Sequence, residues 1–158
     1  MPSNEKTVTY SKTEQINTVL PKDTNSANRL FGGALMQWMD IVAGIVAHRH
    51  SGCQVTTASV DSLNFLAPAN QGDLIVLIGK MTYVGNTSME VRIDAFTETY
   101  DGQRQRINRA YFVMVAIDQN NVPVPVPQLV LETEEEKKEW ESAQKRQQLR
   151  KKRRQEKY

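Results

Sequence analysis

The hydrophobic pattern of the chain changes its period near residue 53. Before that point one long apolar stretch, residues 34–47, follows a Gly32-Gly33 pair. Its length and its Ala, Leu and Met content predict a buried helix rather than a strand. Basic residues at 48–50 occupy the expected last turn, where cations meet the negative helix end, and Ser51-Gly52 ends the helix.

After this helix apolar and polar residues alternate, which is the pattern of half-buried strands. An earlier segment, residues 7–20, is rich in β-branched residues and predicts a first strand. The order of strand, long helix and further strands predicts an α+β protein, with one curved antiparallel sheet wrapped around a helix that is apolar nearly all round. Such a sheet leaves edges, and dimerisation is one way to cover an edge. The strands expected after the helix are residues 54–66, 73–84, 88–99 and 107–117.

The C-terminal part of the chain has a different composition. Three prolines at alternate positions between residues 122 and 128 exclude regular helix or sheet and predict an extended segment. Beyond them the sequence predicts a highly charged helix with few apolar residues. We therefore divide the chain into a folded domain, residues 1–130, and a charged C-terminal helix or tail, residues 131–158.

The formal net charge of +2 hides two oppositely charged parts. Residues 145–158 carry eight basic residues and one acid, which leaves 12 Lys and Arg against 17 Asp and Glu in the rest of the chain. The basic block is suited to nucleic acid or an anionic membrane, and its other interpretation is a solvated helix end that frays. We expect it to add little to folding and to attract an anionic ligand through long-range charge.

Features that would direct the chain out of the cytoplasm are not seen. A single cysteine, Cys53, allows no intramolecular disulfide, which agrees with a reducing compartment. The first thirty residues contain no apolar core of a secretory signal, and no apolar run is long enough to span a bilayer. We expect a soluble cytoplasmic protein.

Asp40 is the chemical anomaly of the sequence, because it is the only acid inside the most apolar segment. Gln37 and Gly44 share its helical face, and no Lys or Arg lies three or four residues away. Burying an unpaired carboxylate is costly, and desolvation makes it a better general base. Two interpretations stay open: a functional base, or a structural acid that accepts hydrogen bonds from the backbone of another segment.

Two further features lie just before Asp40. Glycines at a helix start, Gly32-Gly33, let a ligand approach, and the first-turn N–H groups can bind an oxyanion. The loop before them contains Asn25 and Asn28, whose amides can hold a water or a carbonyl, although ordinary loop asparagines are the simpler interpretation. Asp40 lies about two turns, roughly 10 Å, beyond the glycines, so both groups can reach one carbonyl only through another segment, another subunit or water.

Other reactive residues have no partner in the sequence. Cys53 has no base tied to it, so a packed or exposed thiol is the simpler interpretation. His48 and His50 are two residues apart on a helix and therefore diverge, which makes them a poor metal pair. The chain contains neither a GxxxxGK phosphate loop nor a GxGxxG motif.

The chain resembles the acyl-CoA hydrolase branch of the hotdog superfamily in three runs: DTNSANRLFGGALMQWMDIVAGIVAHRHSG, VTTASVDSLNFLAPANQGDLI and YVGNTSMEV. That branch includes small bacterial acyl-CoA thioesterases and the duplicated cytosolic acyl-CoA hydrolases of animals. The resemblance covers about residues 10–128. It implies a hotdog dimer, usually assembled into hexameric trimers of dimers, that hydrolyses acyl-CoA thioesters to fatty acid and coenzyme A at the subunit interface.

The resemblance also implies roles for individual residues. Asp40 in WMD matches the catalytic carboxylate, and Asn25 in DTN matches the catalytic asparagine that the opposite subunit supplies. Gly33 in FGG would present its backbone N–H to the thioester carbonyl, and Thr87 and Ser88 lie where such proteins hold coenzyme A. Asp40 would activate water, or attack directly to give an anhydride. No metal or redox cofactor is implied, because coenzyme A is part of the substrate.

Two other functions are compatible with a hotdog fold. The hotdog dehydratases rely on a catalytic histidine, and no histidine precedes the central helix here. The other rival is a non-catalytic hotdog protein that binds acyl-CoA, or that contacts nucleic acid or membrane through its basic tail. The intact Asp40 and Asn25 favour the enzyme, and the tail lacks the aromatic residues that interleave with bases.

Overall fold

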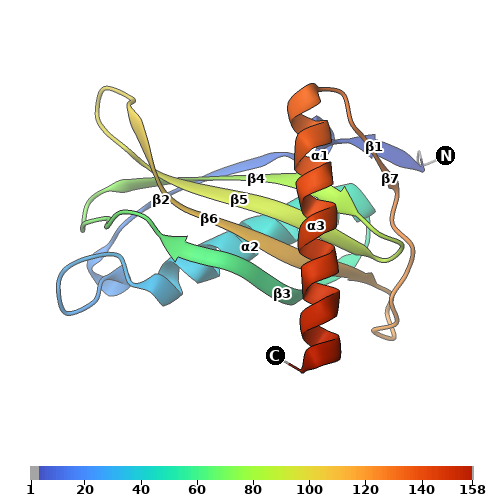
Figure 1. The fold of residues 1–158 in the computed structure, drawn as a ribbon. Helices are drawn as coiled ribbons and strands as arrows, with labels where there is room; N and C mark the ends of the chain where they lie inside the picture. Colours follow the sequence, from blue (N-terminus) through green and yellow to red (C-terminus); the bar gives the residue numbers. More distant parts are fainter. Residues whose placement is uncertain (1–3, 158) are drawn as a thin grey trace.

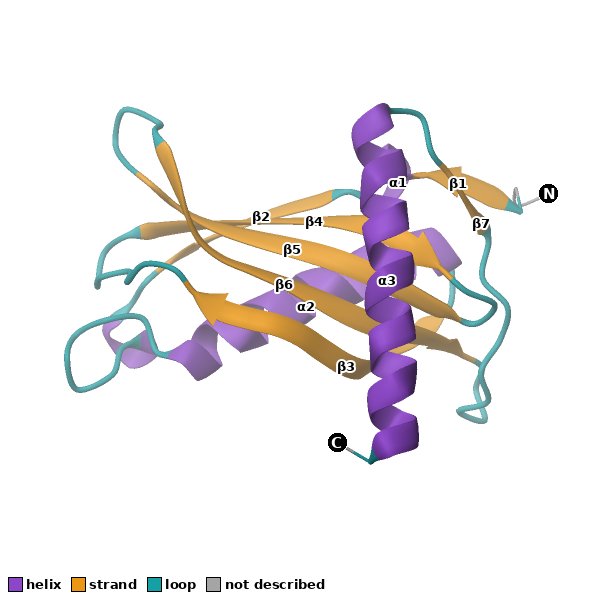
Figure 2. Ribbon diagram, viewed as in Figure 1, coloured by secondary structure: helices purple, strands orange, loops and turns teal. Residues whose placement is uncertain are grey.

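The computed structural model describes residues 4–157 and consists of a twisted sheet with one long helix on each face (Figure 1). In the view of Figure 2, α2 lies behind the sheet and α3 crosses in front of it. The elements in chain order are β1 (Glu5–Thr7), α1 (Val8–Ser11), β2 (Thr13–Thr18), the 3-10 turn η1 (Pro21–Asp23), α2 (Gly32–Ser51), β3 (Gln54–Phe65), β4 (Leu74–Val84), β5 (Ser88–Glu98), β6 (Arg104–Ile117), β7 (Gln128–Val130) and α3 (Glu134–Glu156).

The main sheet has five strands in the order β2-β4-β5-β6-β3, and all its neighbours are antiparallel. β2 and β3 form the two opposite edges of this sheet, and α2 connects them in the chain. A separate parallel pair joins β1 to β7. The predicted α+β hotdog arrangement is confirmed.

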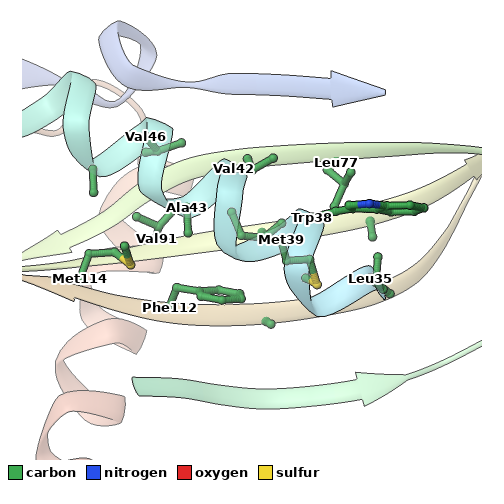
Figure 3. Close-up of a cluster of buried hydrophobic side chains, with 14 of the residues drawn as sticks. Leu35, Trp38, Met39, Val42, Ala43, Val46, Leu77, Val91, Phe112 and Met114 are labelled. Atoms are coloured by element: carbon green, nitrogen blue, oxygen red, sulfur yellow. The ribbon is translucent and has the colours of Figure 1, made fainter. Parts of the chain in front are cut away.

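The inner face of α2 forms the core of the protein. Leu35, Met39, Val42 and Val46 recur at helical spacing, are fully buried and point toward the sheet (Figure 3). Gly79 of β4 lets the helix approach closely, because a Cβ at this position would lie 2.8 Å from Val42 Cγ1. The core therefore depends on one small residue of the sheet as much as on the large residues of the helix.

The outer face of α2 differs from the expectation of a helix buried all round. Met36 is 39% exposed and Ile41 is 46% exposed, and Gln37 and Asp40 between them are exposed as well. The sheet of one chain is not curved enough to reach this face. An apolar stripe with polar groups within it is thus left uncovered along the helix.

The end of α2 was predicted correctly, except for one side chain. Gly52 caps the helix in the left-handed conformation, with φ of 70°. His50, expected as a cation of the last turn, is instead fully buried, and its Nε2 lies 2.8 Å from the carbonyl oxygen of Pro127. Burial lowers the pKa of His50, against the opposing effect of this hydrogen bond, and Lys6 lowers it further.

The predicted first strand, residues 7–20, is wrong in part. Only Thr13–Thr18 pair with β4, and a helical turn, Val8–Ser11, precedes them. Thr7 begins this turn because its side-chain oxygen accepts a hydrogen bond from the backbone N–H of Tyr10. A local cap thus overrides the β propensity of the neighbouring residues.

The C-terminal helix α3 does not fray as one interpretation of the basic block suggested. Thr133 and Glu136 form a capping box at its start, and the helix continues to Glu156. Trp140 packs against Tyr83 of β4 with ring centroids 4.4 Å apart. The helix therefore lies on the sheet and forms a second layer.

A buried carboxylate holds the basic half of α3 in place. Glu90 of β5 is 1% exposed, and it accepts hydrogen bonds from Arg146 at 2.7 Å and from Arg150 at 3.0 Å. Arg150 also donates to Asp61 of β3 at 2.7 Å. These contacts disagree with the expectation that residues 145–158 add little to folding, because three of the eight basic residues, Arg146, Arg150 and Arg153, pair with acids of the sheet under the helix.

Candidate active site

Asp40 lies on the uncovered face of α2 and is held by a residue of the sheet. Its Oδ1 accepts a hydrogen bond of 2.6 Å from Thr57 Oγ1 of β3. The carboxylate is exposed, so a single chain does not provide the burial that its apolar neighbours suggested. Its partner is a hydroxyl rather than the backbone, which disagrees with the interpretation of a structural acid bound by backbone donors.

Thr57 is the site residue that the sequence did not indicate. Its hydroxyl can donate only one proton, and donating it to Asp40 fixes one carboxylate oxygen while the other stays free to accept. In the sequence Thr57 looks like an ordinary β-branched strand residue. Only the packing of α2 on β3 brings it to Asp40, across 17 positions of the chain.

The loop before α2 occupies the side-chain oxygen of Asn25 and leaves its NH2 group available to donate. Its Oδ1 accepts from the backbone N–H groups of Ala27 at 3.0 Å and Arg29 at 3.2 Å. These two donors identify the oxygen of the amide, so Nδ2 and its two protons are directed elsewhere. Asn28, the second candidate of this loop, has φ of 58° and donates its N–H to the Asn25 carbonyl, so it shapes the turn.

The start of α2 is open to an anion, as the glycine pair suggested. The N-cap residue is Phe31, whose side chain makes no capping hydrogen bond, so the first-turn N–H groups lack a side-chain acceptor. Gly33 is exposed. Only glycine fits beside the Phe31 ring here, because a Cβ at this position would lie 2.5 Å from Phe31 Cε1. This turn can therefore bind a negatively charged oxygen.

An apolar cavity of about 290 Å³ lies beside this turn. Asn25 and Arg29 contribute to its wall, and Leu35 of α2, Phe65 of β3 and Ile107 of β6 supply part of its apolar lining. Asp40 is not part of this wall. Within one chain the structure groups Asn25 and the helix start with the cavity, and it places the Asp40–Thr57 pair further along the helix.

Thr87 and Ser88 line a different cavity from Asn25, on the α3 side of the sheet. Both line a cavity of about 480 Å³ between the sheet and α3. The structure thus brings these two residues together, but it does not bring either of them to Asp40. Within residues 4–157 no three His, Cys, Asp or Glu side chains are placed to hold a metal ion, and no helix there is both long and apolar enough to cross a bilayer.

A long helix packed on a five-stranded antiparallel sheet, with an exposed carboxylate on that helix, is the arrangement of a hotdog protein. Residues 27–101 match the family model of the thioesterase superfamily. An uncharacterized acyl-CoA thioester hydrolase of Bacillus subtilis is 44% identical over 127 residues, which is 80% of this chain and 74% of that protein. The chain belongs to the thioesterase superfamily.

Solved structures agree with this assignment. Acyl-CoA hydrolase of Staphylococcus aureus, in complex with butyryl coenzyme A, coenzyme A and coenzyme A disulfide, has a TM-score of 0.91 at 35% identity, over 96% of this chain and 93% of that chain. An apo-hexameric acyl-CoA thioesterase has a TM-score of 0.90 at 39% identity, over 94% and 96%.

The spacing of three residues can also be compared. The Staphylococcus aureus hydrolase has been solved with alanine in place of an asparagine, an aspartate and a threonine. In that chain the aspartate lies 15 positions after the asparagine and the threonine 17 positions after the aspartate. Asn25, Asp40 and Thr57 have the same two separations.

Proposed function

We propose that the chain hydrolyses acyl-CoA thioesters to a fatty acid and coenzyme A, at a site shared by two copies of the chain. One observation carries the proposal: the Asp40–Thr57 pair stands on an uncovered apolar face of α2, apart from the oxyanion-binding helix start. Each chain therefore presents two half-sites that do not meet. The matching separations in the Staphylococcus aureus hydrolase support the choice of residues.

A second copy of the chain completes the site by covering the outer face of α2. Phe31, Met36 and Ile41 are all more than a third exposed, and association would remove them from water. The same association buries Asp40 and brings it to the Asn25 loop of the partner. The hexameric relative supports a further assembly of such dimers into a trimer of dimers.

The geometry assigns a task to each group. Asp40 takes a proton from water through the oxygen that Thr57 does not occupy, and the water attacks the thioester carbon. The first-turn N–H of Gly33 stabilises the oxyanion, and Asn25 donates from Nδ2 to the carbonyl or to the water. The bond to sulfur then breaks, and the thiol of coenzyme A leaves with the proton from Asp40. Direct attack by Asp40 to give an anhydride is the alternative route.

The apolar cavity beside Asn25 would receive the acyl chain. It lies next to the helix start that binds the carbonyl oxygen, and all but two of its lining residues are apolar. Thr87 and Ser88 would contact the coenzyme A part of the substrate from their own cavity. The chemistry as written requires no metal or redox cofactor, and we place the enzyme in the cytoplasm.

Release of the thiol from acyl-CoAs of two to eighteen carbons, followed with a thiol reagent, tests this function. We expect turnover with a preference for chains that the cavity of about 290 Å³ accommodates. Binding of acyl-CoA without release of thiol would contradict hydrolysis and support the non-catalytic rival.

A further inference from the structure

A buried amide without a partner lies beside the cavity proposed for the acyl chain. The side chain of Asn108 in β6 is fully buried, and neither its Nδ2 nor its Oδ1 forms a hydrogen bond with any residue that the structure describes. Most buried polar atoms of folded proteins have a hydrogen-bond partner, because their lost hydration is otherwise uncompensated. Asn108 therefore keeps a donor and an acceptor available to a molecule that is not part of the chain.

The side chain of Asn108 belongs to the face of the sheet that α2 covers. Phe112 and Met114 lie an even number of positions further along β6 and are core residues (Figure 3). Residues 108–115 pair with β5 without a register shift, so the alternation of faces holds back to Asn108. Ala95, directly opposite on β5, is a core residue as well. The amide thus points toward the interior and away from α3.

A β-bulge turns two successive side chains of β6 inward at this point. The register shift between Ala95 and Phe96 leaves Ile107 without a partner on β5. Ile107 is nevertheless buried, next to Asn108, and it lines the cavity of about 290 Å³. Bulges redirect side chains and are common beside active sites. The bulge therefore places the amide next to the wall of this cavity.

The ring that separates Asn108 from the rest of the cavity is not held on all sides. Phe65 of β3 pairs with Asn108 across the ladder, lines the cavity and is 53% exposed. The same ring lies against the first turn of α2, since a Cβ at Gly32 would lie 3.1 Å from Phe65 Cζ. A chain whose carbonyl binds at this turn can displace the exposed ring and reach the amide.

We infer that Asn108 determines which acyl chains the cavity accepts, and that it favours chains with a hydroxyl group over plain alkyl chains. The inference rests on the proposed function and narrows its substrates to hydroxyacyl thioesters. One hydroxyl can accept from Nδ2 and donate to Oδ1, so it satisfies both atoms of the amide. An alkyl chain satisfies neither of them, and a site with buried polar groups discriminates strongly against a ligand that leaves them unpaired.

Pairs of acyl-CoAs test the inference. Chains of four to eight carbons are compared as the plain compound and with one hydroxyl at successive carbons from the third onward. In the wild type, kcat/KM of the best hydroxylated compound should exceed that of its plain counterpart at least about tenfold. Asn108→Leu is similar in size and cannot form hydrogen bonds, so this ratio should fall to about one or below.

The ratio is the decisive readout, because a loss of folding or of the Asp40 chemistry lowers both constants together. The matched control is Asn64→Leu, the same change at an exposed residue of β3 that is not part of the cavity wall. Asn64→Leu should keep the wild-type ratio.

Two results would overturn the inference: a wild type that hydrolyses plain chains as well as hydroxylated ones, or an Asn108→Leu chain that keeps the wild-type ratio. Either would show that the amide does not meet the substrate. Calorimetric binding of the same pairs to the Asp40→Asn chain separates the inference from the proposed function. If the hydroxylated compound binds more tightly but the wild type hydrolyses no thioester, the proposed function fails while the role of Asn108 stands.

Discussion

Asp40 and Glu90 are two carboxylates on opposite faces of one sheet, and their surroundings differ. Asp40 is exposed on α2, and a single hydroxyl, that of Thr57, holds one of its oxygens. Glu90 is buried under α3, and two arginines and a threonine occupy both of its oxygens. A carboxylate with an unused oxygen can still accept a proton, whereas a saturated one can only hold structure together. We therefore expect chemistry from the first and stability from the second.

The Glu90 side of the comparison predicts the largest effect. Glu90→Gln removes the buried charge that Arg146 and Arg150 share and leaves them only Glu139 and Asp61, so the free energy of unfolding should fall by about 3–5 kcal/mol. Urea denaturation measures this. Glu135→Gln, at an exposed acid of α3 that pairs with Lys80 of β4, should cost less than about 1 kcal/mol. Equal losses in the two variants would show that Glu90 is not a clamp.

Truncation after Ala143 should act in the same direction as Glu90→Gln, because it removes both arginines that neutralise Glu90. A truncated chain with an unchanged melting temperature would restore the original expectation of a dispensable tail.

The Asp40 side of the comparison predicts a loss of activity without a loss of stability. Asp40→Asn keeps the shape of the side chain and removes the base, so kcat should fall at least about 10²-fold. Asp101→Asn, in an exposed turn of the β5–β6 connection, is the control and should retain its activity. Steady-state thiol release and thermal melting separate the two outcomes. Near wild-type turnover in Asp40→Asn would remove it from the mechanism.

A variant of Thr57 tests whether its hydrogen bond orients the Asp40 carboxylate. Thr57→Val keeps the volume and removes the hydrogen bond that orients the carboxylate, so kcat should fall about tenfold, with KM nearly unchanged. Thr56→Val changes the adjacent residue of β3, which makes no side-chain hydrogen bond to Asp40, and should have little effect. If the two variants behave alike, Thr57 does not position the base.

The smallest expected effect is that of His50 on the pH dependence of the free energy of unfolding. Burial lowers its pKa below the usual 6.5, so the unfolded chain binds a proton more readily than the folded one. Its contribution to stability is complete above about pH 6.5 and is lost as the pH falls toward the lowered value. Urea denaturation at pH 7.5 and pH 5.5 should show a larger loss for the wild type than for His50→Gln; an equal loss in both would assign the dependence to other groups.

The sequence predicted those elements whose pattern is local. The helix around Asp40 and the strands after it followed from their apolar periods, because burial on one face imposes that spacing. The turn after Thr7 was missed, since one capping hydrogen bond outweighed β propensity. The contacts of Thr57 with Asp40 and of Arg146 with Glu90 span 17 and 56 positions, and such pairs depend on how the elements pack rather than on local sequence.

The shared site is the central claim, and complementation tests it most directly. Asn25→Ala and Asp40→Asn chains, each nearly inactive alone, are unfolded together and refolded as a mixture. Random pairing makes half of the dimers hybrids, each with one intact and one doubly defective site, so about a quarter of wild-type activity should return. If no activity returns although exchange of tagged subunits is demonstrated, both residues act within one chain and the account is contradicted.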